Sequence, residues 1–205
     1  MAHFLEIDAH HPDYRSVGQI AGCLEKGGIA ILPTDSIYAM VTLLGNQKGM
    51  ERICAMNGTK PNKTKLSLLC SDLATISGFT MPISNSTFRI LKHSLPGPFT
   101  FVLKANKKIP QLFHYNRKQI GVRIPNLELI HSVIERLGYP LISTSIHADD
   151  DILEYSPDPR EIYDRYEDLV DMFVDGGPGG IEPTTVVDCS ENQPVILRQG
   201  AGMLD

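Results

Sequence analysis

Short apolar segments rich in β-branched residues alternate with amphipathic segments through the first two thirds of the chain. Residues 16–26 repeat apolar side chains at helical spacing and end at Gly27 and Gly28, and residues 29–32 then form an apolar run that Pro33 stops. The spacing is typical of a helix with one buried face, and the short run is typical of a buried strand. The alternation predicts an α/β fold whose strands deliver loops at one edge of a sheet.

The same alternation continues along the chain. Helices are predicted around residues 50–58, 88–95, 127–137 and 158–166, and strands at residues 66–70, 99–104, 121–124 and 141–142. In the last third, apolar runs at residues 169–174, 185–187 and 195–197 are separated only by Gly, Pro and Asn punctuation. Strands that follow one another without a helix tend to pair antiparallel, so we expect a mixed sheet.

The length of 205 residues is typical of one domain, so residues 1–205 are expected to fold together. Hydrophobic residues make up 42% of the chain and charged residues 21%, which is the composition of an ordered globular protein. The net charge of -5 argues against a protein that binds nucleic acid over its whole surface. Any contact with nucleic acid is therefore expected to be local.

Cysteine spacing and the N-terminal residues indicate the cellular environment. Cys23, Cys54, Cys70 and Cys189 are widely separated and form no Cys-X-X-Cys pair, so we expect buried free thiols rather than zinc ligands or disulfides. The first residues lack the features of a secretory signal, and no apolar run is long enough to cross a bilayer. These observations predict a cytoplasmic protein without a membrane partner.

Familiar phosphate and metal motifs are missing from the sequence. It contains neither a Walker loop nor the glycine fingerprint of a dinucleotide site. The glycines of residues 175–180 either form an anion-binding nest or a flexible turn, and the turn is favoured. The carboxylates of residues 149–151 either hold Mg²⁺ or are solvated, and solvation is favoured. His3, His10 and His11 have no partners at metal-ligand spacing.

Hydroxyl groups and arginines recur just beyond the ends of predicted strands. They are Thr34, Ser36, Tyr38, Arg123, Ser143, Thr144, Ser145, Thr184, Thr185 and Arg198. Each hydroxyl alone is explained by capping of a turn or helix. In α/β sheets, however, strand ends converge on a ligand crevice, where hydroxyls orient polar ligands and arginine binds carboxylate or phosphate. Together these residues predict one site for a polar, anionic ligand.

Six motifs in order resemble those of one protein family. PTDSIYAM at residues 33–40 is similar to the PTETVYGL signature of the Sua5/YciO/YrdC family, and the other five motifs span most of the remaining chain. These are LPGPFTFVLK at 95–104, IGVRIP at 120–125, LISTS at 141–145, PTTVVD at 183–188 and LRQG at 197–200. The resemblance implies a twisted mixed α/β sheet with helices on its faces and a central concave groove.

The resemblance also implies a function. Family members similar to this chain are L-threonylcarbamoyladenylate synthases, which combine L-threonine, bicarbonate and ATP and release pyrophosphate on the way to N6-threonylcarbamoyladenosine in tRNA. Mg²⁺ is expected to accompany ATP. By motif match, Thr34, Tyr38, Arg123, Ser143 and Thr184 would bind threonine. Ser145 and Arg198 would bind the nucleotide. Such chemistry needs positioning and positive charge rather than a covalent nucleophile.

One stretch departs from the pattern of the active synthases. Where they carry Lys-Gly-Arg-Pro, this chain has Asn57, Gly58 and Thr59. The departure resembles the YciO branch of the family. Three lysines follow, and they either replace the missing cations as nucleotide ligands or form an exposed basic loop. They are Lys60, Lys63 and Lys65.

A binding protein without synthase activity is the alternative function. The family resemblance also suggests that the groove holds double-stranded RNA or tRNA. Basic residues that cluster after the predicted strand at 99–104 are candidates for phosphate contacts. They are Lys104, Lys107, Lys108, Arg117 and Lys118. A scaffold that kept the groove and lost its chemistry is a third possibility.

Overall fold

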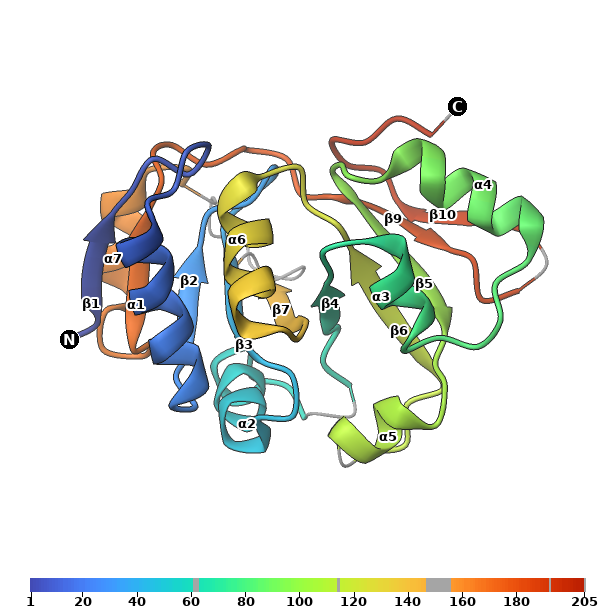
Figure 1. Ribbon diagram of the computed structural model, residues 1–205, viewed down its shortest axis with the longest axis horizontal. Helices are drawn as coiled ribbons and strands as arrows, with labels where there is room; N and C mark the ends of the chain where they lie inside the picture. The colour runs from blue at the N-terminus through green and yellow to red at the C-terminus, as the bar shows by residue number, and fades with distance from the viewer. Residues whose placement is uncertain (61–62, 114, 147–155, 192, 205) are drawn as a thin grey trace.

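A mixed sheet with helices on its faces forms the frame of the computed structural model, which describes residues 1–60, 63–113, 115–146, 156–191 and 193–204 (Figure 1). Within these residues the sheet has 10 strands in the order β1-β8-β2-β3-β7-β4-β6-β5-β9-β10. Parallel pairs join β1 to β8, β8 to β2, β4 to β6 and β5 to β9, and the other neighbours are antiparallel. The predicted fold class, α/β with a mixed sheet, is confirmed.

The strands are short and the helices compact. The strands are β1 His3–Glu6, β2 Ala30–Leu32, β3 Ala39–Leu43, β4 Ser67–Leu69, β5 Phe99–Lys104, β6 Gln119–Arg123, β7 Leu141–Ser145, β8 Met172–Asp175, β9 Thr185–Asp188 and β10 Val195–Arg198. The helices are α1 Tyr14–Glu25, α2 Gln47–Met56, α3 Leu73–Ser77, α4 Asn85–Ser94, α5 Lys108–Phe113, α6 Glu128–Leu137 and α7 Pro159–Tyr166.

Capping residues define the ends of α1 and α6, which cover one face of the sheet. The Asp13 carboxylate accepts the backbone N–H groups of Arg15 and Ser16, both at 3.0 Å, and so begins α1. At the C-terminal end of α6, Gly138 adopts a φ of 70°, a left-handed conformation that glycine adopts without strain. This glycine directly follows the helix predicted at 127–137, whose C-terminal end is confirmed.

Two apolar layers hold the sheet between its helices. α1 and α6 lie side by side and bury Ile20, Leu24 and Val133 against one layer, which also contains Val41. The other layer contains Phe101 and Phe173, with one buried side chain or more from each of α2, α3, α4, α5 and α7. Burial of this much apolar surface is the main term that stabilises such a fold. The positions that these apolar side chains occupy determine where polar side chains can lie on the sheet.

The register of the central strands gathers small polar residues on one face. Ser67 of β4 pairs with Gly121 on one side and with Ser143 on the other, so the three lie in one row across the sheet. Arg123 follows Gly121 by two positions and therefore points to the same face. A Cβ atom at Gly121 would lie 2.5 Å from Ser67 Oγ. Glycine is thus required for this close row.

Several element predictions need correction. Pro33 stops the strand expected at 29–32 and a loop was expected after it, but this loop is short: Ala39 and Met40 already begin β3, which lies antiparallel to both β2 and β7. The strand expected at 169–174 is β8 and starts only at Met172, because residues 167–169 still form the turn that ends α7. β1, α3 and α5 were not predicted from the sequence.

Candidate functional site

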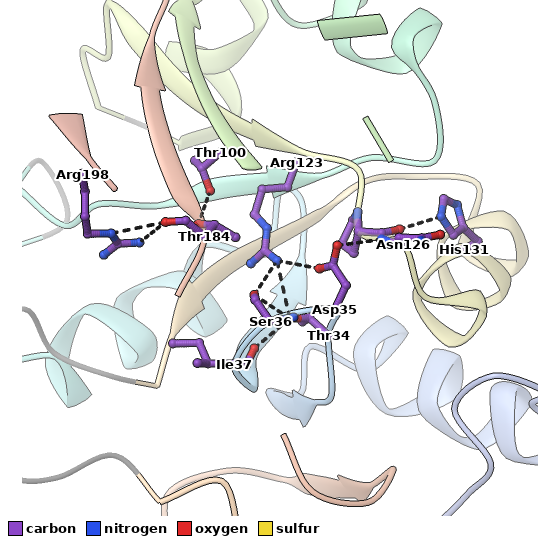
Figure 2. Close-up of polar contacts among 11 residues, drawn as sticks. Thr34, Asp35, Ser36, Ile37, Thr100, Arg123, Asn126, His131, Thr184 and Arg198 are labelled. Atoms are coloured by element: carbon purple, nitrogen blue, oxygen red, sulfur yellow. Dashed lines mark hydrogen bonds and ion pairs between the residues drawn. The ribbon is translucent and has the colours of Figure 1, made fainter. Parts of the chain in front are cut away.

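The centre of the candidate site is the buried guanidinium of Arg123, at the end of β6. Its Nη2 donates to Ser36 Oγ at 3.0 Å and to Asp35 Oδ1 at 3.1 Å, and a longer contact of 3.4 Å reaches Thr34 Oγ1 (Figure 2). All three acceptors belong to the segment between β2 and β3. The structure therefore brings Thr34 and Arg123 together, whereas their contact with threonine stays a prediction.

Backbone contacts fix this segment in place. Thr34 Oγ1 donates to the carbonyl of Ile37 at 2.7 Å, and the N–H of Gly180 donates to the carbonyl of Ser36 at 2.7 Å. The Asp35 carboxylate accepts the N–H of Asn126 at 2.9 Å and so ties the segment to the residues that follow β6. The hydroxyl and carboxylate oxygens around Arg123 are thus preorganised without a ligand.

The glycine-rich segment 175–180 supports that arrangement instead of presenting an anion nest. The N–H groups of Gly176, Gly177, Gly179 and Gly180 all donate to protein oxygens, at 2.7 to 3.1 Å. A Cβ atom at Gly180 would lie 2.5 Å from the carbonyl oxygen of Ser36, so this close approach requires glycine. These backbone donors already have partners, which argues against the anion-nest interpretation.

The Tyr38 side chain contacts the same glycine-rich segment. Its side chain is buried, its ring stacks on Phe173 with centroids 5.7 Å apart, and its hydroxyl donates to the carbonyl of Gly177 at 2.7 Å. The hydroxyl also accepts the N–H of Gly176 at 3.1 Å. The Tyr38 hydroxyl therefore holds the glycine-rich segment, and a contact of Tyr38 with threonine remains a prediction.

A second guanidinium approaches from β10. Arg198 Nη2 donates to the carbonyl of Thr184 at 3.1 Å, and the hydroxyls of Thr184 and Thr100 are 2.8 Å apart. Burial lowers the pKa of Arg123, Asp35 opposes that shift, and the positive charge of Arg198 adds to it. Arg198 is therefore close enough for its charge to act on Arg123. Two guanidinium groups on one face of the sheet favour an anionic ligand, because arginine is the residue that binds carboxylate and phosphate with a planar set of donors.

The hydroxyl run of β7 completes the polar face. Ser143 is buried and donates to the carbonyl of Ser67 at 3.3 Å, and Ser145 lies two positions further on the same face. Thr144 points to the opposite face, where its Oγ1 accepts the side-chain amide of Asn57 at 3.2 Å. Asn57 thus lies directly beside β7 and makes a neutral hydrogen bond there.

The three candidate lysines lie on the surface of the segment between α2 and β4. Lys60, Lys63 and Lys65 are exposed. The segment itself is held by the Thr59 and Thr64 hydroxyls, 2.6 Å apart, and by a bond from Thr64 Oγ1 to the carbonyl of Lys60 at 3.0 Å. Their predicted role in nucleotide binding stays a prediction, because the structure does not describe any of them in contact with Arg123.

Two cavities of the described residues lie away from the predicted groove. One cavity of about 440 Å³ is lined by Glu6, Ile7, Asp8, Asp175 and Gly177. Another of about 280 Å³ lies between the start of α4 and residues 189–191. Neither is lined by Arg123 or Arg198, so the central concave groove also stays a prediction.

Metal ligands and reactive thiols do not define a further site. Among the described residues, no group of three or more His, Cys, Asp or Glu side chains is arranged to hold a metal ion, and residues 149–151 lie outside that part of the chain. All four cysteines are free, and burial raises the pKa of Cys70 to about 12. No helix of the described part is long and apolar enough to cross a bilayer.

Comparison with known proteins decides the family. The model of the family Sua5_yciO_yrdC, described as "Telomere recombination", matches residues 22–200. The chain belongs to this family. Within the Sua5/YciO/YrdC family, it is 37% identical to the uncharacterized protein YciO of Escherichia coli over 203 residues, which cover 98% of this chain and 97% of YciO. The crystal structure of E. coli YciO covers 99% of this chain and matches it with a TM-score of 0.90.

Synthases of the same family are more distant. The chain is 25% identical over 201 residues to the threonylcarbamoyl-AMP synthase of Bacillus subtilis, and spans 55% of the length of that protein. Sua5 of Pyrococcus abyssi, solved in complex with L-threonine, has a TM-score of 0.83 at 20% identity, with 57% of its chain covered. The last match shows a shared fold.

Proposed function

We propose that this chain binds L-threonine and ATP and forms the mixed anhydride of threonylcarbamate and AMP at a low rate. The observation that carries the proposal is the convergence of the Arg123 guanidinium, preorganised hydroxyls and a second guanidinium on one face of the sheet. Thr34, Arg123, Ser143 and Thr184 are assigned to threonine, with Arg123 on its carboxylate. Ser145 and Arg198 are assigned to the nucleotide, and the exposed lysines Lys60, Lys63 and Lys65 to its outer phosphates.

The proposed reaction needs no covalent intermediate on the protein. The free amine of threonine and bicarbonate give a carbamate and water. A carbamate oxygen then attacks the α-phosphorus of ATP while the bond to pyrophosphate breaks. Holding the reactants together and stabilising the phosphoryl charge are then the main tasks of the protein. Mg²⁺ would bind together with ATP as its counter-ion. The product would supply the threonylcarbamoyl group for the modification of tRNA. The neutral residues at 57 and 59 are the reason to expect a low rate.

Labelled threonine tests this proposal. Purified protein is incubated with ¹⁴C-threonine, bicarbonate, ATP and Mg²⁺, and the adenylate and pyrophosphate are quantified beside an active synthase. We expect both products in equal amounts, at a rate lower than that of the active synthase by a factor of about 100 or more. Calorimetry with threonine is run in parallel. Absence of both products and of threonine binding would remove the proposal, whereas binding without products leaves a binding protein.

A second candidate function is the binding of double-stranded RNA or tRNA, and the distribution of charge favours it. Residues 52–127 contain 12 of the 19 Lys and Arg residues but only one of the 24 Asp and Glu residues, Asp72. Hydrogen bonds join the parts of this region that carry exposed lysines: Arg117 Nη2 donates to the carbonyl of Thr64 at 2.5 Å, and the N–H of Ala105 donates to the carbonyl of Lys118 at 2.9 Å. We call the exposed lysines of these joined segments the basic patch; they are Lys60, Lys63, Lys65, Lys104, Lys107, Lys108 and Lys118.

Salt dependence distinguishes this candidate from the first. We expect the affinity for a short RNA duplex to fall steeply with added salt, because each phosphate contact releases condensed counterions. The double variant Lys107→Gln/Lys108→Gln should bind more weakly and lower the slope of log K against log salt by about 2. Fluorescence anisotropy at several salt concentrations gives the slopes. The matched control replaces Lys26 and Lys48, exposed lysines outside the basic patch. A flat salt response, or equal losses in the two double variants, would contradict RNA binding by the patch.

A further inference from the structure

Asp35 is the one carboxylate that contacts Arg123 within the described residues. Its side chain is 9% exposed, and its two oxygens accept from Arg123 Nη2 at 3.1 Å and from the N–H of Asn126 at 2.9 Å. Figure 2 shows it beside the hydroxyls of Thr34 and Ser36, at the side of Arg123 that faces α6. Asp35 therefore brings a fixed negative charge into the site assigned to threonine.

Asp35 leaves part of the Arg123 guanidinium unused. All three hydrogen bonds of the guanidinium to described residues start from Nη2, whereas Nε is buried and has no partner among those residues. A buried N–H group without a partner is costly, and an anionic ligand would provide one. The site thus combines an unsatisfied cationic donor with a neighbouring carboxylate.

We propose that Asp35 binds the ammonium group of the amino-acid ligand whose carboxylate binds Arg123, and so makes the site selective for a zwitterion. This inference rests on the proposed binding of threonine. In an α-amino acid, the ammonium and carboxylate groups are separated by one carbon, which matches a guanidinium and a carboxylate in contact with each other. A carboxylic acid without the amine is repelled by the negative charge of Asp35 and has no ammonium group to donate a hydrogen bond to it.

Two ligands that differ only in the amine test this selectivity. L-threonine and (R)-3-hydroxybutyrate share the carboxylate and the hydroxyl, and their dissociation constants are measured by calorimetry. We expect wild-type protein to bind 3-hydroxybutyrate at least about 10-fold more weakly, since a charge-assisted hydrogen bond is lost. Asp35→Asn should weaken threonine binding by a similar factor and bring the two constants within about 3-fold of each other. Asp72→Asn, in which the replaced aspartate caps α3, should keep the wild-type ratio.

The outcomes separate this inference from the proposed function. Equal affinity of wild-type protein for both ligands, or an Asp35→Asn variant that keeps the wild-type preference, would overturn the role of Asp35 while threonine binding stands. If wild-type protein binds neither ligand, the proposed function fails together with the inference. A thermal melt of Asp35→Asn confirms that it is folded, because the substitution removes the counter-charge of a buried guanidinium. If the variant does not fold, the ratio of the two dissociation constants of wild-type protein is the test, and a ratio near one contradicts the proposed selectivity.

Discussion

Replacing Arg123 with methionine is expected to lower the free energy of unfolding by about 3–5 kcal/mol. The guanidinium and the Asp35 carboxylate are 3.1 Å apart, with only 5% and 9% of their side chains exposed. Removing the cation leaves the Asp35 carboxyl group without its counter-charge in a poorly solvated position, and also leaves the hydroxyls of Thr34 and Ser36 without their donor. Urea denaturation monitored by circular dichroism measures the change.

The double variant Arg123→Met/Asp35→Asn provides the control. Asparagine keeps an oxygen that accepts the N–H of Asn126 but carries no charge, so the double variant should be more stable than Arg123→Met by about 1–3 kcal/mol. An additive result, in which the double variant is the less stable of the two, would contradict a direct interaction between the side chains. We also expect Arg123→Lys to weaken threonine binding, because a lysine keeps the charge but not the planar set of donors.

Helices and strands with strong periodicity could be predicted from the sequence. The strand expected at 99–104 is β5 with the same bounds, and the helix expected at 127–137 is α6, shorter by one residue. Both have local signals that agree with their packing: β5 is rich in aromatic and β-branched residues, and α6 carries a continuous apolar stripe that ends at glycine. For these elements, the tertiary structure adds little to the local preference.

Elements that depend on distant partners were not predicted. β3 begins inside the motif at 33–40 and is defined by antiparallel pairing with β7, about 100 residues later in the chain. β1 exists because it pairs with β8, at the other end of the sequence, and its four residues are too few for a periodic signal. α5 contains Pro110, which reads as a helix breaker but is tolerated in the first turn of a helix.

Residues of the candidate site were predicted by type but not by contact. Hydroxyls and arginines beyond strand ends do gather, as Thr34, Ser36 and Arg123 illustrate. Asp35 was overlooked, although its position between the two site hydroxyls of Thr34 and Ser36 was the available signal. The bond between Asn57 and Thr144 joins positions 87 residues apart, and no pattern in one sequence predicts it.

Restoring two cations is expected to raise adenylate synthesis by a factor of about 100 or more. The change is the double variant Asn57→Lys/Thr59→Arg, which introduces the residues that active synthases carry in this stretch. Asn57 contacts Thr144 near the end of β7, on the face opposite Ser143 and Ser145, so a longer cationic side chain is needed to reach around the end of the strand to the assigned nucleotide site. Positive charge there would stabilise the negative charge that develops on the phosphates during transfer. The labelled-threonine assay measures the rate.

The control for this variant adds two cations at other positions of the chain. Phosphoryl charge is stabilised only by donors placed where the charge develops, so two cations added elsewhere should not help. Gln47→Lys/Gln111→Arg adds the same charges at exposed helix positions and should leave the rate unchanged. If both double variants raise the rate equally, general attraction of ATP is the cause and position 57 has no special place. If neither does, although both remain folded and bind threonine, the neutral pair at 57 and 59 is not what separates this chain from the synthases.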